Sequence, residues 1–101
     1  MNDNKQHGID VELSAEVAQG HYSNLAIISH STSEFIIDFA SLLPGMPKAA
    51  VNSRIILTPE HAKRLLLSLQ DNVARYESNV GRIELHQPQP HIGFNKNHGE
   101  A

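Results

Sequence analysis

The sequence predicts an α+β fold, in which an antiparallel β-meander of three to four strands is followed by one long C-terminal helix packed on one sheet face. Three observations support it. Several segments between residues 9 and 57 alternate apolar and polar residues, as half-buried strands do. Residues 59–79 instead repeat apolar residues every three or four positions, as an amphipathic helix does. The length of 101 residues allows one domain.

The helix has a clear start signal. Thr58 can cap free first-turn N–H groups, Pro59 suits the first helical position, and Glu60 complements the positive helix end. Asn79 and Gly81 indicate a stop. The expected apolar stripe contains Ala62, Leu65, Leu66, Leu69, Val73 and Tyr76.

Three main strands are expected over residues 22–30, 34–39 and 49–57. A shorter alternating run at 9–13 is expected to be a first strand. Residues 44–48 contain two prolines, which cannot donate to a strand ladder, so they predict a loop.

The hairpin register follows from keeping the apolar face whole. A three-residue turn at 31–33 would place Ile27 opposite Ile37 and Leu25 opposite Phe39. The helix is then expected to cover one sheet face, bearing Leu25, Ile27, Phe35, Ile37, Phe39, Val51, Ile55 and Leu57.

The opposite face of this predicted sheet is unusually apolar for a face exposed to water. Scattered surface apolar residues would be one explanation. A patch that contacts a partner is the explanation we favour. The predicted protein-interface residues are Tyr22, Ile28, Ile36, Arg54 and Ile56.

The composition narrows the function classes. The net charge of −3 argues against a nucleic-acid partner, and no apolar run approaches the ~18 residues of a membrane span. Zero cysteines exclude disulfides and fit a cytoplasmic protein. Residues 1–8 are expected to be a flexible leader, 9–80 the single domain and 81–101 a flexible tail.

No residue set predicts an enzyme, a cofactor or a metal site. The histidines lack the i, i+4 helical spacing of a metal pair; they are His7, His21, His30, His61, His86, His91 and His98. Neighbouring strand residues Ser29 and His30 point to opposite faces.

Two further charged groups have a simpler explanation than chemistry. Glu34 and Asp38 lie ~13 Å apart along a strand, beyond the separation of glycosidase carboxylate pairs. They are expected to solubilise the face or to pair with Arg54. His61, Lys63 and Arg64 could bind an anion at the helix start, but a solvated face is the explanation we favour.

Several sequence stretches resemble a bacterial domain-of-unknown-function family with the pattern YxN…EFxxDF…SRxxxTPxHAKxL. The matching residues are Tyr22–Asn24, Glu34–Phe39 and Ser53–Lys63, completed by Tyr76-Glu77. The order of strands and helix is also similar to the SecB-like chaperone fold. That resemblance implies dimers or tetramers that bind unfolded protein clients.

These features lead to a non-enzymatic protein-interaction module that self-associates through its sheet as a dimer or tetramer. It would act as a SecB-like chaperone or an adaptor with a protein client. The alternative is a DNA-linked regulator that forms a small strand-helix dimer, which the net charge disfavours.

Overall fold

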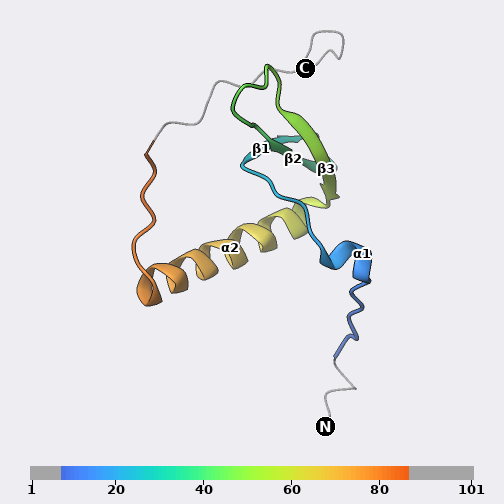
Figure 1. Ribbon diagram of the computed structural model, residues 1–101. Coiled ribbons are helices and arrows are strands. Elements are labelled where there is room, and N and C mark those ends of the chain that lie inside the picture. The colour runs from blue at the N-terminus through green and yellow to red at the C-terminus, as the bar shows by residue number, and fades with distance from the viewer. Residues whose placement is uncertain (1–7, 87–101) are drawn as a thin grey trace.

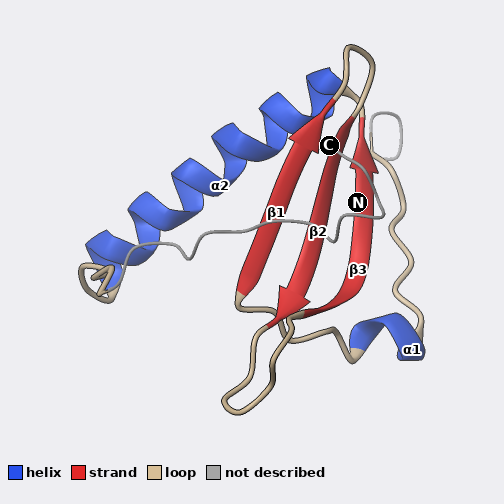
Figure 2. Ribbon diagram, turned by 90° about the horizontal axis from the view of Figure 1, so that it is seen from above, coloured by secondary structure: helices blue, strands red, loops and turns tan. Residues whose placement is uncertain are grey.

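The computed structural model describes residues 8–86, which form a three-stranded antiparallel sheet and two helices (Figure 1). The chain runs through α1 (Ala15–Ala18), β1 (Leu25–His30), β2 (Phe35–Ser41), β3 (Ala50–Leu57) and α2 (Pro59–Asn79). Strand β2 lies between β1 and β3 (Figure 2). This is the α+β meander with a C-terminal helix that the sequence predicts. The predicted flexibility of residues 1–7 and 87–101 concerns segments outside the described residues.

The β1–β2 hairpin has a different register from the predicted one. Ile28 lies opposite Ile37, and His30 lies opposite Phe35 with the two rings stacked at 5.2 Å. The loop therefore contains four residues, 31–34. Within it, the Ser31 hydroxyl accepts hydrogen bonds from the N–H groups of Ser33 and Glu34, and these bonds shape the turn. The predicted pairing of Ile27 with Ile37 is wrong by one residue, and every β1 side chain moves to the other face.

The β2–β3 pair contains a bulge. Phe39 faces Ser53 while Ala40 faces Val51, so Asn52 has no partner in the ladder. Beyond the bulge the alternation of β3 shifts by one residue. Val51 therefore shares a face with Ala40, and its predicted place on the face of Ile55 is wrong.

The segment before β1 is not a strand. Residues 9–13, the expected first strand, have no ladder partner among the described residues, and they lead into the short helix α1. The Ser14 hydroxyl accepts from the N–H of Val17, and Gly20 follows the helix with a φ of 74°. The sequence prediction missed this helix, although Ser14 and Gly20 are its start and stop signals.

Helix α2 begins and ends as predicted. The Thr58 hydroxyl accepts from the N–H of His61 at 3.1 Å, and Pro59 occupies the first turn. Helix α2 contacts the sheet chiefly through β3, the strand from which it emerges. It then diverges from the sheet along its length (Figures 1 and 2). The expectation that the helix covers the sheet therefore holds only near its first turns.

The core of the described chain is very small. Ile37 and Ala40 are the buried apolar residues between residues 8 and 86, and Asp38 beside them is the buried polar one. All three belong to the central strand β2, which has a neighbour on each side. The rest of the apolar surface of the sheet and of α2 remains accessible.

Candidate interaction surface

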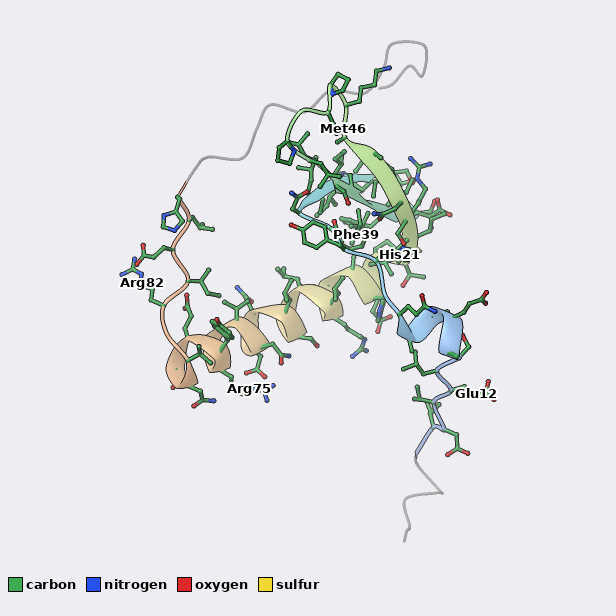
Figure 3. The ribbon with its side chains drawn as sticks, in the orientation of Figure 1. Glu12, His21, Phe39, Met46, Arg75 and Arg82 are labelled. Atoms are coloured by element: carbon green, nitrogen blue, oxygen red, sulfur yellow. The ribbon has the colours of Figure 1, made fainter. Side chains whose placement is uncertain are left out.

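The observed registers define two faces of the sheet. The helix-side face comprises Ala26, Ile28, His30, Phe35, Ile37, Phe39, Ser53, Ile55 and Leu57. The clasp face comprises Leu25, Ile27, Ser29, Ile36, Asp38, Ala40, Val51, Arg54 and Ile56. In Figure 3, Phe39 lies on the side of the sheet that is turned toward α2.

The helix-side face and the helix stripe are both apolar and both open. On the sheet, Ile28 is 61% exposed and Ile55 is 43% exposed. On the helix, the exposed members of the stripe are Leu65, Leu66, Leu69, Val73 and Tyr76. Because α2 diverges from the sheet, these two apolar surfaces do not cover each other within one chain (Figure 1).

The clasp face is organised around one ion pair. Asp38 faces Arg54 across the β2–β3 ladder. The Arg54 guanidinium donates from Nε to Asp38 Oδ1 at 2.6 Å and from Nη2 to Oδ2 at 2.8 Å. This bidentate geometry is the strongest arrangement available to an arginine and a carboxylate. The Asp38 side chain is 2% exposed, whereas that of Arg54 is 57% exposed.

This pair changes the acidity of Asp38. Hydrogen bonds from Arg54 stabilise the carboxylate and lower the pKa of Asp38 below its usual 3.8, although burial acts in the opposite direction. Asp38 is therefore ionised at neutral pH. A permanently ionised carboxylate held by a guanidinium is a structural pair, and it is poorly suited to proton transfer.

A second group of polar contacts fastens the chain before β1. The carbonyl of Tyr22 accepts from Ser41 Oγ at 3.0 Å and from Nδ2 of the bulged Asn52 at 3.1 Å. The Asn24 amide exchanges two hydrogen bonds with the backbone of Leu42. These side chains replace ladder hydrogen bonds where the regular strand pairing ends.

The predicted interface residues do not form one patch. Ile36, Arg54 and Ile56 lie together on the clasp face, with Ile36 directly opposite Ile56. Ile28 lies on the helix-side face because of the changed register. Tyr22 precedes β1, and its side chain is exposed. Ile28 therefore does not share a face with Ile36 and Ile56, contrary to the sequence prediction, whereas Ile36, Arg54 and Ile56 lie on one face.

The α2 stripe is an exposed apolar surface that the predicted interface residues did not include. The α2 stripe was expected to be internal, yet its leucines are exposed. Its 3.6-residue period shows that one helix face is apolar. That period carries no information on whether the covering surface belongs to the same chain, so the sequence held no signal for this exposure.

The residues that the sequence analysis considered for catalysis, anion binding or metal binding are spread over the described chain. Ser29 and His30 lie next to the β1–β2 turn, on opposite faces of the sheet. Arg64 of the basic group at the α2 start pairs with Glu60 at 2.6 Å. Between residues 8 and 86, no three His, Cys, Asp or Glu side chains gather as metal ligands would. Within the same residues, neither helix could cross a membrane.

Comparison with known proteins identifies a family. The family model described as "Protein of unknown function (DUF3467)" matches residues 1–85. The chain belongs to this family. The match extends from the N-terminus through all three strands and α2. No curated protein and no solved structure matches the chain.

In this DUF3467 member, the residues that carried the sequence resemblance mostly hold the fold together. The Asn24 side chain and the backbone carbonyl of Tyr22 hold the chain before β1, and Asp38 pairs with Arg54. Thr58 caps α2. At the other end of the helix, Glu77 Oε2 accepts the N–H of Ile83 at 3.0 Å. These contacts give several residues of the pattern a structural role.

Proposed function

We propose that this protein is a non-enzymatic protein-interaction module that works as a homodimer, and that the dimer serves as a SecB-like chaperone or an adaptor. A second copy would cover the α2 stripe and the helix-side face. The clasp face would remain available to a protein client. The observation that carries the proposal is the small core, in which Ile37 and Ala40 are the buried apolar residues of the described chain.

The small core limits the stability of a single chain. Ordering a residue costs about 1–2 kcal/mol of backbone entropy, which burial of apolar surface must offset. Full burial of a large aliphatic side chain contributes about 1.5–3 kcal/mol. Two buried apolar residues, one of them alanine, and half-buried neighbours such as Phe35 and Phe39 are a small core for the ordering of three strands and a 21-residue helix. A cooperative fold therefore needs further burial, and another polypeptide can supply it.

A second copy fits the surfaces left open. Each copy offers an apolar helix stripe and an apolar sheet face, so two copies related by a two-fold axis can satisfy both at once. The dimensions agree, because α2 is ~31 Å long and an eight-residue strand such as β3 spans ~26 Å. Each half-exposed large apolar side chain that becomes covered would contribute on the order of 1 kcal/mol.

The clasp face supports the client-binding part of the proposal. It presents Val51 at 48% exposure and Ile56 at 57% exposure beside the half-exposed Arg54 guanidinium. Arginine is enriched at protein interfaces, and the exposed aliphatic side chains beside it add apolar surface that a bound segment can cover. The ion pair anchors the arginine, so its orientation is set before a client arrives.

The first experiment measures the solution mass of the full chain by size-exclusion chromatography with light scattering. Two variants test the route of assembly. Leu69→Glu places a charge on the stripe, whereas Leu67→Glu places the same charge about 160° around the helix. The two leucines are 58% and 55% exposed, so they are a matched pair in the single chain.

We expect a dimer for the wild-type chain and for Leu67→Glu. Leu69→Glu should weaken association by at least about 100-fold, because each copy loses a buried leucine and gains a desolvated charge. A wild-type mass of 11.2 kDa at all concentrations would overturn the proposal. Equal effects of the two substitutions would show that the stripe is not the contact.

Client binding is tested with an unfolded protein as the probe. The dimer should slow the aggregation of reduced, unfolded α-lactalbumin, and Ile56→Asp on the clasp face should reduce this protection while leaving the dimer mass unchanged. Protection that is the same for Ile56→Asp and wild type would contradict a client site on this face. If the wild-type dimer does not slow aggregation, the chaperone role is rejected. The adaptor role would then require a specific folded partner.

A further inference from the structure

Residues 9–13 combine a strand-like pattern with an open position in the structure. Ile9 and Val11 are 87% and 88% exposed, and Leu13 is 68% exposed. Asp10 and Glu12 alternate with them. Such alternation is typical of a strand with one apolar face and one charged face. No ladder partner for the segment exists among the described residues.

The sheet has a matching open edge. Strand β3 pairs with β2 on one side, and no described residue pairs with its other side. It is eight residues long, so its outer edge offers enough unpaired backbone groups for a five-residue partner. Its two faces differ in charge, because the helix-side face carries Ile55 and Leu57 whereas the clasp face carries the Arg54 guanidinium together with Val51 and Ile56.

We infer that residues 9–13 of one copy form a fourth strand along the outer edge of β3 in a second copy. This inference rests on the proposed homodimer and adds a second, reciprocal contact to it. With Ile9, Val11 and Leu13 beside Ile55 and Leu57, strand alternation places Asp10 and Glu12 on the clasp face. There they lie on the same side as the Arg54 side chain, which is 57% exposed. The remaining N–H groups of its guanidinium can donate hydrogen bonds to a further carboxylate.

The alternative edge, on β1, fits less well. The β1 side chains on the clasp face include Leu25 and Ile27, and those on the helix-side face include Ile28 and His30. Neither face of β1 carries an arginine or lysine. A strand beside β1 would therefore place Asp10 and Glu12 against aliphatic residues or a histidine, without the cation that β3 provides.

The position of the segment favours a second copy as the acceptor. Residues 8–14 lead away from the sheet, and Glu12 lies far below β3 in Figure 3. Helix α1, which joins the segment to the rest of the chain, is capped by Ser14 and followed by Gly20 at a φ of 74°. Pairing with another chain leaves α1 unchanged, whereas a return to the β3 edge of the same chain would require it to be rearranged.

Paramagnetic relaxation in mixed dimers tests the inference. A nitroxide is attached to Gly8→Cys, which is the sole cysteine of that chain, and this chain is refolded together with ¹⁵N-labelled wild type. Only contacts between copies can then broaden the observed amide signals. We expect the strongest broadening in β3 and weaker broadening in β1, which lies ~10 Å further from the added strand.

Two substitutions in the spin-labelled chain provide the matched control. Val11→Asn places an amide on the apolar side of the segment and should abolish the β3 broadening. Glu12→Asn introduces the same residue on the other side and should retain most of it. If both substitutions reduce the β3 broadening equally, the assignment of Val11 to the apolar side and of Glu12 to the charged side is contradicted.

The outcomes separate this inference from the proposed dimer. A dimeric mass without broadening, or with the strongest broadening in β1, overturns the strand donation and leaves the dimer intact. A monomeric mass overturns the dimer and, with it, the donation.

Discussion

At the scale of single residues, Asp38 and Arg54 are the most informative pair. Asp38 is 2% exposed in the centre of the sheet, a position where an unpaired carboxylate would be costly. Two hydrogen bonds from Arg54 remove that cost and link β2 to β3. The pair therefore fixes the register of these strands, since a slip by one residue would leave the buried charge alone.

This pair should appear in the acid unfolding of the protein. Because the pKa of Asp38 is lowered in the folded chain, its ionised form stabilises the fold above the usual value of 3.8. That contribution is lost as the pH falls through the lowered pKa. The stability advantage of wild type over Asp38→Asn should therefore be largest near neutral pH and shrink below about pH 4.

The measurement is urea denaturation between pH 2.5 and 7. Asp71→Asn is the control, because Asp71 pairs with Arg75 on the exposed surface of α2 with both side chains about two-thirds exposed. Its stability should follow the wild-type profile throughout. An Asp38→Asn profile parallel to wild type through the acid range would contradict the role given to the pair.

At the scale of elements, α2 shows how far local signals reach. Thr58, Pro59 and Glu60 set its first turn, and the structure begins the helix where the sequence predicts. Its last residue, Asn79, also agrees. Such signals act through backbone groups within one turn, so they do not depend on what the helix packs against.

The cap offers a measurable element-scale effect. Thr58→Ala removes the acceptor of the His61 N–H group and should lower the free energy of unfolding by about 1 kcal/mol. Thr58→Ser keeps a hydroxyl and should retain most of the wild-type value. Thermal or urea unfolding monitored by circular dichroism measures both, and equal losses for the two variants would argue against capping.

The β1–β2 hairpin shows where local reasoning fails. The sequence prediction maximised contact among apolar residues and chose an odd-length turn. The Ser31 hydroxyl instead accepts two N–H groups within the turn, and the loop is one residue longer. One residue is enough to exchange the faces of Ile27 and Ile28. The apolar pattern carries no information on this contact within the turn, so it cannot decide the register.

At the scale of the whole molecule, the exposed apolar surface dominates. The helix-side face, the α2 stripe and residues 9–13 are each apolar on one side and uncovered in the described chain. A monomer that exposed all of them would be prone to aggregation. The proposed dimer uses all three surfaces, and the folding of each copy would then depend on the other.

That dependence predicts a concentration effect. If folding and association are coupled, the midpoint temperature of unfolding should rise with protein concentration. A series from micromolar to millimolar chain, followed by calorimetry or circular dichroism, tests this. For Leu67→Glu, the midpoint temperature should rise with protein concentration as steeply as it does for wild type. A midpoint independent of concentration, together with a monomeric mass, would show that one chain is stable alone.

The sequence by itself determined the three strands, helix α2 and their order. It missed α1, and it predicted a strand at residues 9–13, where the structure has none. Alternation defined the three strands, and the cap and apolar period defined α2, because these signals depend on neighbours within a few residues. Only the tertiary structure decided which side chains share a face. The register depends on a turn and a bulge. The turn sets which β1 side chains share a face with those of β2, and the bulge exchanges the faces of the β3 residues beyond it. The tertiary structure also decided that α2 diverges from its own sheet. An amphipathic period shows that one helix face is apolar, but it does not show which chain covers that face.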